Sequence, residues 1–472
     1  MVLRPTMESH RIPSQKSSGK FARQFGSGRH IKMLDLFLTA YDPSDLPGSS
    51  IDPLGFERGY LLLADKILPG LTNVASHPRY FALLCAGIHL SGDTTDDRRE
   101  VVRKHRQEII LRLERFWALA NVLARPDDSG GVRGVTYAQA WARDLQRSEA
   151  ARTTANYPLL SRQSQYGAIG MYANVASGMR FLNREDLSLT PALGEVAAEA
   201  FCDETKLPNT LRRAVVEDGD VSLATLKSWG QEAHVEAEVK ATEAKCLSEA
   251  LHGNSVRSRT AALLLQHPRK NDKETELERL KRIGRALRGN DESQDLRETF
   301  QCIQEFESCY QLAALAFERL LWLCRHHAAA SIKISELKSD PVMGIISDRL
   351  PLRVKQLTSI LDDGTNAAFR QNLDRLSDVR RFLEEASAGT ADLNVFIAAI
   401  VARHTDIQHG KFDRGRRKMP WIELNEGRIT LTMTRAGGMN WEATMPDQIQ
   451  AHPYRLNAAD AFNFASVKAS QS

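Results

Sequence analysis

The chain has 472 residues, enough to bury one large core or two to three domains. The net charge is only +4, which excludes a strong field over the whole protein, so any contact with a polyanion must be local. The six cysteines include no CxxC pair, which argues against a zinc ribbon and a disulfide framework and favours a reducing, cytoplasmic compartment. Hydrophobic runs are too short to span a bilayer, and the N-terminus has no secretory signal.

The first 30 residues have the composition of a flexible arm. They are rich in Ser, Gly, Arg and Lys, and Glu8 is their only acidic residue. Segments of this kind bury too little apolar surface to fold, so we expect residues 1–30 to form a flexible basic arm. Such an arm either contacts nucleic acid or is a disordered leader.

Two helical domains are expected after the arm. The first covers residues 31–266, and a polar, charged link at 267–272 marks the boundary. The second covers residues 273–472 and is centred on the long, progressively apolar segment 295–330, which predicts a buried central helix. Two further helices are predicted, over 350–361 and 367–386.

A turn and an apolar helix follow each other in the first domain. Pro69-Gly70-Leu71-Thr72-Asn73 forms the turn, and the helix opens at Ser76 and ends near Leu90. Arg79 and Tyr80 lie near the start of this helix and are candidate nucleic-acid contacts. Alternatively, Arg79 caps the carbonyl groups of a neighbouring helix.

A basic helix is predicted from Thr94 to about Ala124, because two threonines and two aspartates supply a good first turn. Apolar positions form its buried side, and cations dominate the other side. The cations are Arg98, Arg99, Arg103, Lys104, Arg106, Arg112 and Arg115, and the acids that offset them beyond the first turn are Glu100, Glu108 and Glu114. This face either contacts DNA or is an ordinary solvated helix face.

Residues 157–183 have the most unusual composition, with small residues, amides and tyrosines at helical spacing. An amide can pair bidentately with a base edge, and a tyrosine ring offers a flat face for stacking. The candidates for binding an extruded base are Gln163, Gln165, Tyr166 and Tyr172. A Gln-x-Gln triplet also occurs in one class of helical DNA glycosylases. The alternative is close helix packing through Gly167, Gly170 and Gly178.

Residues 391–454 combine an apolar helix, a basic loop and the only clear β-hairpin. The hairpin strands are predicted at 421–424 and 428–433, because the second alternates cleanly and Asn425-Glu426-Gly427 supplies a short turn. Residues 441–445 are expected to add a third strand.

Cations gather between this helix and the hairpin. A cation at a helix C-terminus complements the helix dipole, which accounts for His404 but not for the loop beyond it. The candidate phosphate-binding residues are His404, His409, Lys411, Arg414, Arg416, Arg417 and Lys418, with Trp421 closing the loop. They predict a clamp on backbone phosphates, and the alternative is a solvated surface loop.

Two short motifs lie far apart in the chain. The first is the turn from Pro69 to Asn73 with Arg79-Tyr80-Phe81 after it, and the second is His452-Pro453-Tyr454-Arg455. Both resemble large, mostly uncharacterised bacterial proteins found in phage-defence gene clusters. The resemblance implies a defence role against foreign DNA and carries over no catalytic residue.

The sequence therefore predicts a mainly α fold, with a multi-helix core and a small C-terminal β-hairpin. For function, we expect a DNA-acting antiphage defence protein, most concretely a DNA glycosylase-like enzyme that attacks an extruded base, modified or unmodified. Such chemistry needs an activated water or a carboxylate beside the sugar, and the sequence does not identify that carboxylate.

The alternative function is a non-catalytic helical sensor or adaptor that binds a phage component or a partner protein. A metal-dependent nuclease is the least favoured, because the chain has no obvious Asp–Glu-x-Lys cluster on a pair of strands. We expect no cofactor, no metal and no membrane contact.

Overall fold

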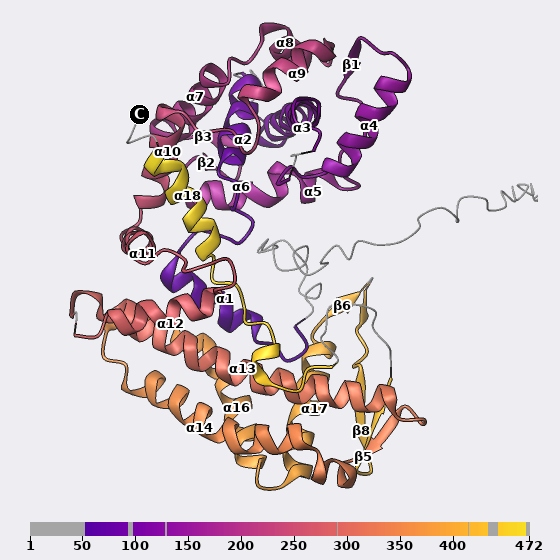
Figure 1. Cartoon of the computed structure of the whole chain (residues 1–472), viewed down its shortest axis with the longest axis vertical. Coiled ribbons are helices and arrows are strands. Elements are labelled where there is room, and N and C mark those ends of the chain that lie inside the picture. The colour runs from indigo at the N-terminus through magenta and orange to yellow at the C-terminus, as the bar shows by residue number, and fades with distance from the viewer. Residues whose placement is uncertain are drawn as a thin grey trace, which may run out of the picture.

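Helices dominate the computed structural model of the chain (Figure 1). It describes residues 52–92, 98–127, 130–289, 291–413, 415–432 and 442–468. The mainly α fold with a small C-terminal β-hairpin is confirmed. The predicted basic arm lies outside the described residues. Within them, no helix combines the length and the apolarity needed to cross a membrane.

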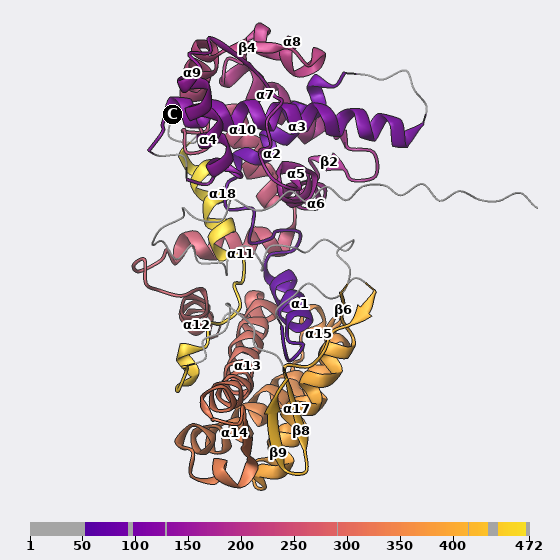
Figure 2. The same ribbon diagram turned by 90° about the vertical axis from the view of Figure 1, so that its right-hand side faces the viewer.

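The helices form two lobes along the long axis of the molecule (Figures 1 and 2). The first lobe consists of α2 (Arg79–Leu90), α3 (Arg99–Ala124), α4 (Val135–Arg147), α5 (Gln163–Tyr166), α6 (Ala168–Gly178), α7 (Val196–Glu204), α8 (Asn209–Glu217), α9 (Leu223–Glu232), α10 (Ala241–His252) and α11 (Ser255–Gln266). The second lobe consists of α12 (Glu276–Ala286), α13 (Gln294–His326), α14 (Pro341–Asp363), α15 (Ala367–Arg370), α16 (Ser377–Gly389) and α17 (Leu393–His409).

The strands are short and antiparallel. The second lobe contains the predicted hairpin, formed by β8 (Ile422–Asn425) and β9 (Arg428–Leu431). The other pairs are β1 (Arg152–Thr154) with β4 (Asp220–Ser222), β2 (Leu182–Asn183) with β3 (Ser188–Leu189), and β6 (Phe412–Asp413) with β7 (Arg416–Arg417).

The third strand of the hairpin sheet comes from elsewhere than predicted. It is β5 (Ser331–Lys333), which pairs with β9 so that Ile332 lies opposite Ile429. The expectation of a strand over 441–445 is wrong, because residues 442–445 form no strand and Trp441 lies outside the described residues. The chain reaches β5 directly after α13, so the end of the central helix places this strand beside β9.

The segment predicted to be the central helix is α13, whose apolar side is buried along most of its length. Beside it, α14 is longer than predicted because Pro351 lies inside the helix rather than at its start. Asp340 caps α14 by accepting the backbone N–H groups of Val342 and Met343.

The two ends of the described chain cross between the lobes. The N-terminal helix α1 (Glu57–Ile67) packs against α13 of the second lobe, whereas the C-terminal helix α18 (Leu456–Lys468) packs against α10 and α11 of the first. One hydrophobic core runs through both lobes. The predicted division at 267–272 stays a prediction.

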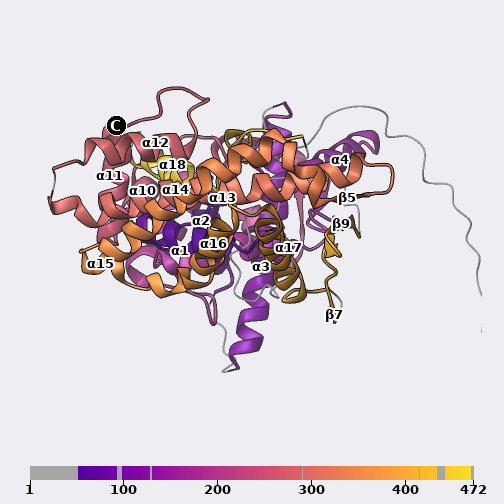
Figure 3. The same cartoon turned by 90° about the horizontal axis from the view of Figure 1, so that it is seen from below.

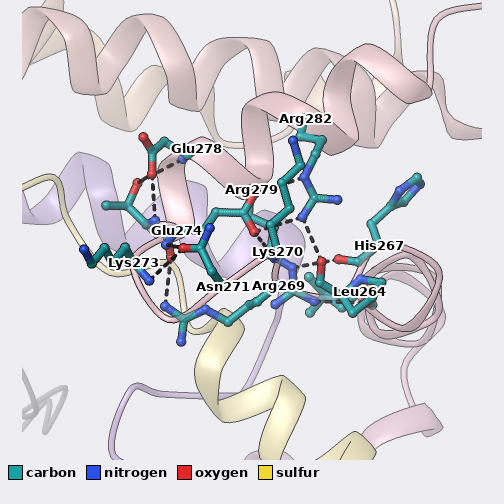
Figure 4. Close-up of polar contacts among 12 residues, drawn as sticks. Leu264, His267, Arg269, Lys270, Asn271, Lys273, Glu274, Glu278, Arg279 and Arg282 are labelled. Atoms are coloured by element: carbon teal, nitrogen blue, oxygen red, sulfur yellow. Dashed lines mark hydrogen bonds and ion pairs between the residues drawn. The ribbon is translucent and has the colours of Figure 1, made fainter.

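Hydrogen bonds hold the charged link that precedes α12 (Figure 4). Arg279 donates to the carbonyl groups of Leu264 and His267, at 2.8 and 2.9 Å. Arg282 donates to both carboxylate oxygens of Glu274 at 2.9 Å, and this contact lowers the pKa of Glu274 to about 2. The link is therefore held between the end of α11 and the start of α12 rather than left as a free tether.

Candidate functional site

Arg79 lies in the interior of the first lobe, with 2% of its surface exposed. It donates to the carbonyl oxygens of Glu232 and His234 at 3.1 and 2.9 Å and forms an ion pair with Glu243 at 3.2 Å. Glu232 is the last residue of α9, so Arg79 has the capping role that the sequence left open as the alternative. A contact with DNA would require this network to open.

Tyr80 and Tyr172 stack on each other in the same interior, with ring centroids 4.5 Å apart. Trp117 packs edge-on against Tyr80, and the guanidinium of Arg133 lies over the Tyr172 ring. The hydroxyl of Tyr80 accepts the backbone N–H of Arg133 at 2.7 Å. Both tyrosines are 1% exposed or less, so neither ring presents a face to solvent.

Gln163 is hydrogen-bonded to a buried carboxyl group. Its amide nitrogen donates to Glu114 at 2.8 Å, and its amide oxygen accepts from Arg115 at 2.8 Å. Glu114 also accepts the backbone N–H of Ala168, the first residue of α6, at 2.7 Å. Burial raises the pKa of Glu114 to about 7, against the opposing effect of these hydrogen bonds.

Gly167 makes this approach of Glu114 possible. A Cβ atom at Gly167 would lie 2.5 Å from the Glu114 carboxylate. The small residues of this stretch therefore serve close packing, and the amide of Gln163 is used inside the protein. Sequence reasoning did not identify Glu114 as a site residue, because it counted only as an acid that offsets the basic face of α3.

Gln165 and Tyr166 lie on the surface of α5, and Tyr166 is 44% exposed. The structure thus stacks Tyr80 on Tyr172, buries Gln163 against Glu114, and leaves Gln165 and Tyr166 on the surface. As nucleic-acid contacts, all five stay a prediction.

The two short sequence motifs, at 69–81 and 452–455, meet between the lobes. The amide nitrogen of Asn73 donates to the Tyr60 hydroxyl at 2.7 Å and to the Pro453 carbonyl at 3.4 Å. Arg455 donates to the Leu68 carbonyl at 3.1 Å. Segments separated by some 380 positions therefore form one joint at the crossing of the chain ends.

A carboxylate and an imidazole lie at the centre of this joint. Glu307 of α13 accepts from His452 Nδ1 at 2.9 Å, from the His452 backbone N–H at 3.0 Å and from the Tyr454 hydroxyl at 2.6 Å. The His452 ring lies between Tyr60 and Tyr310, at centroid distances of 4.8 and 4.2 Å. Sequence reasoning missed Glu307, although His452 and Tyr454 belonged to one of the two motifs.

The charge of Glu307 controls the protonation of His452. Burial alone would lower the pKa of the imidazole, but the charge and hydrogen bond of Glu307 outweigh burial and raise it, with help from Asp52 and Glu57. A carboxylate that holds one ring nitrogen fixes the orientation of the imidazole. The pair therefore forms a buried, charge-coupled connection between the lobes.

His404 and Trp421 hold the base of the loop that leads to the hairpin. His404 Nε2 accepts the backbone N–H of Trp421 at 2.8 Å, and Nδ1 lies 3.1 Å from the carbonyl oxygen of Pro53. Both side chains are buried, so they support the loop rather than contact a ligand in this structure. Lys411 also contributes to this support by donating to the Asp52 carbonyl at 2.6 Å.

The outer part of the loop is the β6–β7 hairpin, in which Phe412 pairs with Arg417. Arg416 and Arg417 are exposed, as is His409 at the end of α17, and Lys418 is partly buried. Arg417 has no carboxylate partner among the described side chains, whereas Arg416 lies opposite Asp413, whose side chain lies outside the described part. Arg414, the other predicted phosphate contact, lies outside the described residues.

Most cations of the basic face of α3 are already engaged. Arg106 and Arg112 donate to backbone carbonyl groups, and Arg115 donates to Gln163. Arg103 and Lys104, near the start of the helix, are exposed and have no ionic partner among the residues that the structure describes. The available charge is thus confined to the outer end of α3.

The outer end of α3 and the β6–β7 hairpin project on the same side of the molecule, one from each lobe (Figures 2 and 3). We call Arg103, Lys104, Arg416 and Arg417 the basic side. It forms no part of the cavity of about 590 Å³ between α3, α4 and α9, which also contains none of the predicted site residues. Within the described ranges, no cluster of His, Cys, Asp and Glu is arranged to hold a metal.

Comparisons with known proteins add no assignment: no protein-family model, no curated protein and no solved structure matches the chain.

Proposed function

We propose that this protein binds duplex DNA through the basic side, as part of a defence against foreign DNA in the cytoplasm. The observation that carries the proposal is that four exposed cations on two projecting elements lack carboxylate partners among the described side chains. The two resembling motifs support the defence role. The six free, buried cysteines suit a reducing compartment.

Exposed cations bind DNA through the charge of its phosphates. An exposed guanidinium or ammonium that neutralises a phosphate releases condensed counterions, so the logarithm of the affinity falls with the logarithm of salt by about 0.9 per phosphate. Such contacts do not read sequence, which agrees with an interface made of Arg and Lys on a helix end and a hairpin. A hydrophobic interface with a protein partner would show no such salt dependence.

The test compares charge reversals on and off the basic side. We expect R103E/K104E and R416E/R417E each to weaken binding of a labelled duplex by about tenfold or more and to reduce the salt slope by about two. The matched control is R349E/K355E, which makes the same charge change at exposed residues of α14, away from the basic side. Fluorescence anisotropy across a salt series measures the affinity and the salt slope of all three variants.

Equal losses in the control and in both basic-side variants would overturn the assignment of the interface. Wild-type protein that does not bind duplex at low salt would overturn DNA binding altogether and favour the sensor or adaptor of a protein partner.

A second candidate function is removal of an extruded base, and the specific observation that favours it is the Glu114 carboxyl group. Glycosidic-bond cleavage needs a group that donates a proton or stabilises positive charge on the sugar. A carboxyl with a pKa of about 7 is present in both protonation states near neutral pH. Its partner Gln163 belongs to the short helix α5, so a base could reach Glu114 only if α5 moved away from α3.

The corresponding assay incubates the protein with modified and unmodified phage genomic DNA, followed by alkali and a denaturing gel. Breaks that appear only after alkali indicate abasic sites, and E114Q should abolish them while leaving duplex binding unchanged. Breaks without alkali would indicate a nuclease instead. Intact DNA would rule out base removal, and DNA binding would remain as the proposed function.

A further inference from the structure

The β6–β7 hairpin exposes two large apolar side chains beside its cations. Phe412 is 53% exposed and Met419 is 61% exposed. Leaving this much apolar surface in water is unfavourable, and folding does not require it, because neither side chain belongs to the hydrophobic core. Arg416 and Arg417 lie between them in sequence.

The register of the hairpin places an aromatic ring and a guanidinium on one face. Phe412 lies directly opposite Arg417, and directly opposed residues of antiparallel strands share a face of the pair. The hydrogen bond from the Lys418 N–H to the Lys411 carbonyl, at 3.0 Å, extends the pairing toward the base of the hairpin. An apolar ring and a cation therefore project together from the second lobe.

Hydrogen bonds anchor the base of the hairpin. It is held by His404 between Trp421 and Pro53, and by a hydrogen bond from the Thr432 hydroxyl to the carbonyl of Pro420. Lys411 ties the first strand to Asp52. Strand ends that such contacts hold before binding lose little conformational freedom when a ligand binds.

We propose that the β6–β7 hairpin is a wedge for duplex DNA: Phe412, supported by Met419, enters between adjacent base pairs while Arg417, on the same face, contacts a flanking phosphate. Proteins that kink DNA pair apolar wedges such as Phe and Met with arginines in this way, because the bend that follows unstacking allows more of the protein to touch the duplex. The positive charge of Arg417 beside the ring favours DNA over an apolar protein surface as the occupant. The inference rests on the proposed DNA-binding function.

The wedge and the phosphate contacts predict different signals. The probe is a duplex that carries 2-aminopurine at a central, flexible TpA step and a fluorophore pair at its ends. Wild-type protein should raise the 2-aminopurine fluorescence and shorten the end-to-end distance. F412A/M419A should abolish both changes while lowering affinity by no more than about tenfold and keeping the salt slope, because the phosphate contacts remain.

Two further variants make the result specific. L352A removes an apolar side chain that is 55% exposed on α14 and should behave as wild type. F412Y retains a ring of similar size and should keep the fluorescence changes, which a general loss of the hairpin structure would not allow.

The outcomes separate the two proposals. Wild-type protein that does not bind duplex overturns the DNA-binding function and the wedge with it. Binding without a 2-aminopurine or end-to-end change overturns the wedge alone. Self-association that F412A/M419A abolishes, with DNA signals unchanged, would instead make this hairpin a contact between two copies of the protein.

Discussion

His404 is held in its neutral form by its surroundings. Nε2 accepts a backbone N–H from Trp421, so protonation of this nitrogen would break a hydrogen bond in a buried position. Burial lowers the pKa of His404 to about 4. In the unfolded chain the imidazole takes up its proton near the ordinary pKa of 6.5, before the folded protein does.

The stability of the protein should therefore fall as the pH drops from about 6.5 to about 4, by roughly 3 kcal/mol from this residue. The stabilisation is fully present above the unfolded pKa and is lost as the pH approaches the folded pKa. H404Q removes the titrating group, so its unfolding free energy should depend less on pH in this window. Urea unfolding at several pH values measures the difference.

The control lies on the same helix. H409Q changes an exposed histidine of α17 and should retain the wild-type pH dependence. An unchanged pH dependence in H404Q would show that His404 is not the group that titrates.

At the scale of elements, α3 and α9 pack with their backbones in direct contact. A Cβ atom at Gly230 of α9 would lie 2.1 Å from the carbonyl oxygen of Ala120 and 2.6 Å from its carbonyl carbon. The same interface contains a hydrogen bond from the Trp117 indole to the Ala233 carbonyl, at 2.6 Å. Because the obstruction is backbone, no side-chain rotation can relieve it.

We expect G230A to separate the two helices and to destabilise the protein by about 3 kcal/mol or more. The matched control is G344A in α14, where a Cβ atom would meet nothing within 4 Å. That substitution should stabilise the protein by about 0.5–1 kcal/mol, since alanine favours the helix and restricts the unfolded chain. Chemical denaturation measures the free energy of unfolding of both variants. Equal changes in G230A and G344A would show that α3 and α9 do not need a glycine at position 230.

At the scale of the whole molecule, the joint at Glu307 couples the lobes. Glu307 comes from the central helix of the second lobe, whereas His452 and Tyr454 lead into α18, which packs on the first. One carboxylate therefore satisfies three buried donors from a segment that belongs to the opposite lobe. Loss of the Glu307 charge should therefore weaken the contact between the two lobes as well as the packing of α13.

E307Q should cost roughly 3 kcal/mol, because a glutamine offers one acceptor oxygen where the carboxylate offers two and leaves the imidazolium without a counter-charge. The raised pKa of His452 adds a pH dependence: its stabilisation is fully present below the ordinary pKa of 6.5 and is lost as the pH rises through the folded pKa. The destabilisation by E307Q should thus be larger at about pH 6 than at about pH 9.

Unfolding monitored by tryptophan fluorescence measures the destabilisation by E307Q at each of the two pH values. E385Q, at an exposed glutamate of α16, is the control and should match wild type at each pH. A destabilisation by E307Q that is the same at both pH values would mean that His452 is not charged in the folded protein.

The sequence alone determined the fold class and the positions of the main elements. Apolar periodicity and turn residues are local signals, which is why α13 and the β8–β9 hairpin lie where the pattern places them. A local pattern cannot show which distant segment will pair with a strand. The pairing of β5 with β9 was therefore not predicted. The helix predicted over 350–361 likewise began too late, because α14 starts at Pro341 and continues through Pro351.

Only the tertiary structure decided which polar residues are available. Tyr172 and Gln163 have the composition of a binding surface, yet their partners Tyr80 and Glu114 come from other helices and place them in the interior. The Glu307–His452 pair spans 145 positions, and no spacing rule connects residues so far apart. The physical reason is that a hydrogen bond or an ion pair depends on where two side chains meet in space, whereas a sequence pattern reports only which face of its own element a residue occupies.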